Sequence, residues 1–133
     1  MRKIKFKAKR LDNGDWIVGD LMHALNDICI GPEHGFKNQR RYLIAVDPDT
    51  VCQFTGFTDK NGKEIYEGDV VNVKPCVCVV EWDEDAGGFY LKEDGAKLHC
   101  VKSLGEMLHS FDSVIIGNIH EQVWQEKLNL KDE

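Results

Sequence analysis

Two cysteines and a later His-Cys pair are the residues of this sequence best suited to bind a transition metal. Cys76 and Cys78 are two positions apart in a β-rich segment, so both side chains face one side of a strand. With His99 and Cys100 they make four ligands of the kind that a tetrahedral zinc site uses. Their spacing is tighter than that of common zinc motifs, which place about two to four residues between paired cysteines. Since cysteines in β cores are usually small buried hydrophobic residues, we expect no metal site.

Other combinations that could support catalysis lack the necessary partners. A nucleophilic cysteine needs a positioned base, and no histidine forms a local motif with a cysteine. The chain contains neither a Walker loop nor a dinucleotide fingerprint. The clustered acidic residues fall in predicted turns, where Asp satisfies backbone donors: Asp47, Asp49, Asp83, Glu84 and Asp85. We therefore expect a protein that is not an enzyme and has no cofactor; a zinc- or thiol-dependent enzyme is the least favoured alternative.

The first ten residues form a basic segment in an otherwise acidic chain. The chain has 17 basic and 23 acidic residues, a net charge of −6, but residues 1–10 contain six basic residues and no acidic one. Lys5, Lys7 and Lys9 alternate with apolar residues, so they share one face of a strand at intervals of ~6–7 Å. One interpretation is a solvated face whose lysines discourage edge-to-edge pairing. The other is a contact for nucleic acid or an acidic partner, helped by Arg40 and Arg41.

Hydrophobic alternation and turn residues predict strands through the first half of the chain. Residues 4–9 and 16–19 form a predicted hairpin, closed by Asn13-Gly14, since this pair tolerates positive φ. Residues 21–23 are expected to extend a strand, and further short strands are expected at 27–30, 42–46 and 51–56. Proline and glycine between residues 31 and 35 indicate a loop.

The second half continues the pattern and adds the only predicted helices. Turns at 59–63 and 67–69 separate predicted strands at 65–66, 70–73, 77–82 and 89–91. Ser103 and Glu106 form a capping-box pattern at the start of a two-turn helix. A last strand at 114–119 and a terminal helix at 120–128 follow. The apolar face expected for the first helix consists of Leu104, Met107, Leu108 and Phe111.

These elements predict one mainly β domain, a β-rich α+β fold. The expected architecture is an antiparallel meander with an SH3-like barrel core and one or two short C-terminal helices. Within a single domain over 1–133, residues 1–48 hold the N-terminal hairpin and variable strands, 49–121 the barrel core and 122–133 a tail. We expect no membrane segment and no secretory signal, since no apolar run approaches ~18 residues. An odd count of five cysteines predicts reduced thiols in a cytoplasm.

Four ordered segments of the chain, residues 1–8, 53–71, 82–89 and 114–121, together resemble the YopX-like family of phage and prophage proteins. The longest runs from Gln53 to Val71 and contains Thr58-Asp59-Lys60-Asn61-Gly62-Lys63 and Glu67-Gly68-Asp69. Residues 1–8 are similar to the family's first strand, Trp82 with Gly88-Phe89 to its next hairpin, and 114–121 to its closing strand. The chain departs from the family at 22–45, at 75–78 and after Glu121, where Gln122-Val123 replace the usual Asn-Pro.

The resemblance implies a setting and no mechanism. It brings no activity, cofactor or catalytic residue to any position of this chain, because the matched residues are mostly turn formers and apolar strand residues. It implies an accessory protein in the cytoplasm of a bacterial host that binds or regulates a phage or host protein, and it permits a homo-oligomer. Nucleic-acid binding by a small β-barrel through Lys5, Lys7 and Lys9 is the alternative.

Overall fold

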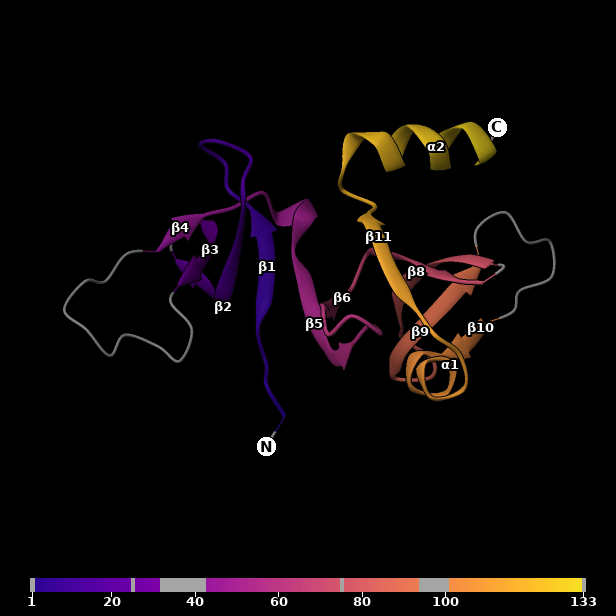
Figure 1. The fold of residues 1–133 in the computed structure, drawn as a ribbon. Coiled ribbons are helices and arrows are strands. Elements are labelled where there is room, and N and C mark those ends of the chain that lie inside the picture. Colours follow the sequence, from indigo (N-terminus) through magenta and orange to yellow (C-terminus); the bar gives the residue numbers. More distant parts are fainter. Residues whose placement is uncertain (1, 25, 32–42, 75, 94–100, 133) are drawn as a thin grey trace. The chain divides into compact units, whose positions relative to one another are not determined.

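A computed structural model describes residues 2–24, 26–31, 43–74, 76–93 and 101–132 (Figure 1). It divides the chain into two compact units, Met1–Gly56 and Phe57–Glu133. Both units consist mainly of antiparallel strands, which confirms the predicted β-rich class, and the short helices lie in the C-terminal unit. No helix among the described segments is long and apolar enough to cross a membrane.

The strands of the first unit follow the order β4-β3-β2-β1-β5 in a six-stranded sheet whose last strand is β6. The strands of this unit are β1 (Phe6–Lys9), β2 (Trp16–Ala24), β3 (Asp27–Gly31), β4 (Ile44–Ala45) and β5 (Cys52–Thr58), with a 3-10 turn at Pro48–Thr50 before β5. The predicted first hairpin is confirmed: Ala8 pairs with Ile17, and Lys9 pairs with Trp16.

Alternation along β1 decides which side chains of the first unit are buried. Ala8 is fully buried and Phe6 packs beside it, while the lysines at positions 7 and 9 lie on the other side of the strand. The core of the unit joins residues from β1, β3 and the segment after β4, and its buried members are Ala8, Ile30 and Val46. Partly buried apolar residues around them are Phe6, Ile17, Leu21, Ile28 and Val51.

The second unit is a five-stranded sheet with the order β10-β9-β8-β7-β11. Its elements are β6 (Glu64–Tyr66), β7 (Asp69–Val73), β8 (Cys76–Asp83), β9 (Gly88–Glu93), β10 (Val101–Ser103), α1 (Leu104–Ser110), β11 (Val114–Asn118) and α2 (Gln122–Asp132). The expected SH3-like barrel over residues 49–121 is not confirmed, because β10 and β11 are opposite ends of this strand order and the sheet is not closed.

Helix α1 begins as the sequence predicts and covers one face of the sheet. The Ser103 hydroxyl accepts the Glu106 N–H at 3.4 Å, so the predicted cap is present. Leu104 is buried at 1% exposure, and Met107 and Leu108 pack against a core that includes Val71, Val80 and Leu91 from three strands. The helix ends at Ser110, and the next residue, Phe111, has extended backbone. Phe111 therefore lies outside the helix whose apolar face it was expected to join.

Candidate functional site

The predicted zinc ligands fall partly in the core and partly outside the described residues. Cys76 and Cys78 share a face of β8, as expected, and this face is directed into the second unit. Cys78 is 3% exposed and Cys76 packs against the same core. His99 and Cys100 lie outside the described residues. Within the described part of the chain, no three His, Cys, Asp or Glu side chains are grouped to hold a metal.

The predicted basic face is present on the first unit and its lysines lie over aromatic rings. The ammonium group of Lys5 is 5.0 Å from the centre of the Phe54 ring. Those of Lys7 and Lys9 are 4.6 Å and 5.6 Å from the centre of the Trp16 ring. Such cation–π contacts contribute about 0.5–1 kcal/mol each at accessible positions. They hold the three charges together along residues 5–9, whereas Arg40 and Arg41 fall outside the described residues.

The same contacts limit what this face can offer a ligand. Phe54 is only 7% exposed, and the Trp16 ring has two lysine head groups above it. Stacking of nucleic-acid bases needs open aromatic faces. Lys5, Lys7 and Lys9 therefore form a charged surface, which we call the lysine face, rather than a stacking platform.

The turn at 59–63 is organised by one buried carboxylate. The Asp59 side chain is 6% exposed, and its Oδ1 accepts the N–H groups of Asn61 and Lys63, both at 2.9 Å. Its Oδ2 accepts the N–H of Ile115 in β11 at 3.1 Å. Burial raises the pKa of Asp59, but these three N–H donors and the charge of Lys63 outweigh it, so the pKa lies below its ordinary value. Asp59 therefore fastens the turn to β11.

The turn at 67–69 is organised by a second buried carboxylate. Asp69, at 2% exposure, accepts the Tyr66 N–H at 2.7 Å and the Asn118 amide at 3.0 Å. Gly68 has φ 86°, donates its N–H to Val80 O and accepts the Ile119 N–H. This backbone conformation favours glycine. The two buried aspartates of the central segment, Asp59 and Asp69, thus serve the fold, in agreement with the interpretation of the segment as fold-determining.

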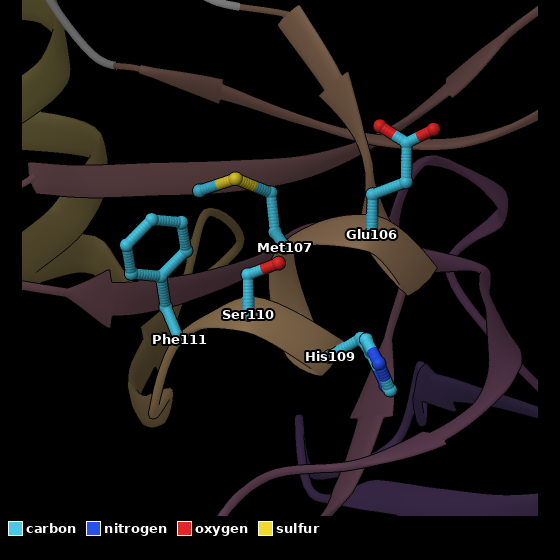
Figure 2. Close-up of a pocket in the computed structure, with 5 residues that line it drawn as sticks. All are labelled: Glu106, Met107, His109, Ser110 and Phe111. Carbon is cyan, nitrogen blue, oxygen red and sulfur yellow. The ribbon is translucent and has the colours of Figure 1, made fainter.

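The ring of Phe111 is an exposed apolar feature that lines a pocket. Phe111 is 50% exposed and caps the C-terminus of α1. A pocket of about 280 Å³ lies beside this helix, lined by Glu106, Met107, His109, Ser110 and Phe111. Figure 2 shows the side chains of Met107 and Phe111 pointing to the same side, with Ser110 between them, while His109 points the other way.

A second pocket, of about 230 Å³, uses the same phenylalanine. It is lined by Lys60, Asn72, Lys74, Phe111, Asp112 and Val114. We call Phe111 with its two pockets the Phe111 surface. The helical spacing in the sequence had suggested a core position for this residue. The polar residues on both sides of Phe111, which are Ser110, Asp112 and Ser113, are the local signal that the helix ends before the ring can be buried.

The fold and these sites define a small β-rich protein with buried structural carboxylates and an exposed aromatic ring, Phe111, that lines two pockets. Residues 5–123 match the family described as YopX protein, and the chain belongs to this family. The resemblance seen in four segments of the sequence is confirmed over 5–123. Membership fits a phage-type protein. A comparison with curated proteins gives no match.

Proposed function

We propose that this chain is a non-enzymatic accessory protein that binds a phage or host protein through the Phe111 surface. The observation that carries the proposal is a half-exposed aromatic ring that lines two pockets. The phage setting comes from the family, and the bacterial cytoplasm is the compartment in which we expect the protein to act.

The anatomy of the Phe111 surface is that of a binding hot spot. Aromatic residues carry much of the energy of protein interfaces, especially where they sit beside pockets that a partner can fill. Met107 adds a flexible apolar side chain next to the ring, and methionine adapts to irregular partner surfaces. Around this apolar centre the exposed lining is polar or charged, as at the rim of an interface: Lys60, Lys74, Glu106, His109, Ser110 and Asp112.

The test compares two substitutions of equally exposed apolar residues in the second unit. Phe111→Ala removes the ring, and Val123→Ala is the matched control, since both side chains are 50% exposed. Tagged variants are incubated with bacterial host lysate, and proteins held by the unmodified chain are quantified by mass spectrometry. We expect a specific captured protein to be lost with Phe111→Ala by about tenfold or more, and retained with Val123→Ala. Equal capture by Phe111→Ala would contradict the proposal, provided circular dichroism shows both variants folded.

The lysine face supports a second candidate function, the binding of nucleic acid. The observation in its favour is that Lys5, Lys7 and Lys9 lie on one face of the first unit. That unit has nine basic and seven acidic residues, whereas the second unit has eight basic and sixteen acidic residues. A long polyanion would be repelled by the second unit, so this function ranks below protein binding.

A further inference from the structure

The smaller pocket of the Phe111 surface is built by three backbone segments that are tied together. Lys60 comes from the turn after β5, Asn72 from β7, and Val114 from β11, where Val114 pairs with Asn72. The Lys60 N–H donates to Ser113 O at 3.0 Å, and the Asp59 carboxylate joins the same turn to Ile115. The walls are therefore fixed in place before any ligand binds, which lowers the entropic cost of binding.

The charge of this pocket is opposite to that of the unit that contains it. Lys60 and Lys74 bring two ammonium groups and Asp112 brings one carboxylate, so the lining is positive, while the second unit has a net charge of −8. Among the residues that the structure describes, neither lysine side chain has an ion pair or a hydrogen bond. Their positive charge is available to an incoming anion.

Resting on the proposed protein-binding function, we propose that this pocket receives an acidic side chain of the partner, with an adjacent apolar side chain packed on Phe111. A carboxylate can be paired by the two ammonium groups and can accept a hydrogen bond from the Asn72 amide. The ring of Phe111 lines the same pocket and offers apolar contact immediately beside it. The partner motif is thus an Asp or Glu next to an apolar residue.

The size of the pocket supports one side chain over a larger ligand. Its volume of about 230 Å³ is below the ~300–1,000 Å³ typical of pockets for small-molecule ligands. A nucleic-acid phosphate would satisfy the same lysines, but the strand that carries it would lie against a unit of net charge −8. We therefore assign the pocket to an acidic protein segment and make nucleic acid an outcome of the test.

The experiment is an NMR titration of the ¹⁵N-labelled full chain with three probes. The first is acetyl-Glu-Leu-amide, the second its neutral match acetyl-Gln-Leu-amide, and the third a short single-stranded DNA. We expect the acidic peptide to shift the amide resonances of Lys60, Asn72, Asp112 and Val114, and the neutral peptide to bind about fivefold more weakly. Equal shifts by both peptides, no shift by either, or stronger shifts by the DNA would each overturn the assignment.

Matched charge variants test which lysines cause the preference for the acidic peptide. Lys60→Gln with Lys74→Gln should remove the preference for the acidic peptide, whereas Lys63→Gln should leave it, because Lys63 is on the same turn but does not line the pocket. An unchanged preference in the double variant would also overturn the assignment. The proposed function is judged separately by the capture assay with Phe111→Ala. Capture that depends on Phe111 but not on Lys60 and Lys74 would leave protein binding in place and remove the carboxylate site.

Discussion

The indole of Trp124 in α2 lies directly over Gly117 in β11. A Cβ at position 117 would overlap Nε1 and Cδ1 of the ring, so no larger residue fits there while the ring stays in place. The pairing of β11 with β7 also shifts register between Ile115 and Gly117. A bulge of this kind re-aims the strand and weakens its edge as a template for further pairing. The Gly117–Trp124 contact therefore packs the first turn of α2 against β11.

Gly117→Ala should displace Trp124 and destabilise the protein. Overpacking of this kind typically costs about 1–3 kcal/mol, which we expect in the free energy of unfolding measured with urea. The indole N–H resonance of Trp124 should move toward the position of an exposed tryptophan. Adding Trp124→Ala should remove the clash with the new methyl group. The double variant should therefore lose less unfolding free energy than the two single variants lose together.

The control for this prediction is Gly88→Ala in β9. A Cβ at Gly88 would meet only Tyr90 Cε1, at an ordinary contact distance of 3.8 Å. Its effect should be near zero or slightly stabilising, since alanine restricts the unfolded chain. If Gly117→Ala were as stable as Gly88→Ala, with the Trp124 resonance unmoved, the contact would have no energetic role.

Asp59 should make stability depend on acid pH. Its pKa is lower in the folded state than in the unfolded chain, where it is about 3.9, so the unfolded state binds more protons. The contribution of Asp59 is then complete above pH ~4 and is lost as the pH falls through the folded-state pKa. We expect the urea concentration at the midpoint of unfolding to decrease once the pH falls below ~4. Asp59→Asn should lower stability at pH 7 by about 1–3 kcal/mol and flatten part of this acid dependence.

The matched substitution for Asp59 is Asp85→Asn in an exposed turn. Asp85 is a solvent-exposed residue of the turn between β8 and β9, and its substitution should change the unfolding free energy by less than about 0.5 kcal/mol. The same acid profile in the unmodified chain and in Asp59→Asn would show that other carboxylates cause the loss of stability.

The sequence was most informative where structure depends on neighbouring residues. The turns around Gly62 and Gly68 and the cap at Ser103 could be predicted, since their geometry is set within a few residues. The exposure of Phe111 could not be predicted, because its helical spacing from Leu104, Met107 and Leu108 does not show that the helix ends one residue before it. The division at Gly56 could not be predicted either, because it falls inside strand β5 and no linker marks it. Whether the sheet closes into a barrel could not be predicted for a similar reason, since closure depends on pairing between residues that are distant in sequence.

The cysteines of β8 should not make this protein a zinc protein. Cys78 belongs to the core of the second unit and Cys76 packs against that core. Binding zinc would therefore break the apolar contacts that these two side chains make there. We expect a native mass spectrum of protein purified without chelator to show no zinc-sized increment; the same spectrum reports whether copies assemble. Stoichiometric zinc that disappears in Cys76→Ser would contradict this expectation and would bring His99 and Cys100 forward as further ligands.

The lysine face gives the last prediction, which separates a stabilising role from nucleic-acid binding. If Lys7 and Lys9 serve mainly to cover Trp16, replacing both with Gln should cost about 1–2 kcal/mol of unfolding free energy and should leave retention of DNA and RNA unchanged. If the face binds nucleic acid, the unmodified chain should instead retard single-stranded DNA at low salt, with affinity falling steeply as salt rises. The variant should then reduce the slope of log affinity against log salt by about two. Because the lysines already lie over buried or half-buried rings and the second unit is acidic, we expect the first outcome.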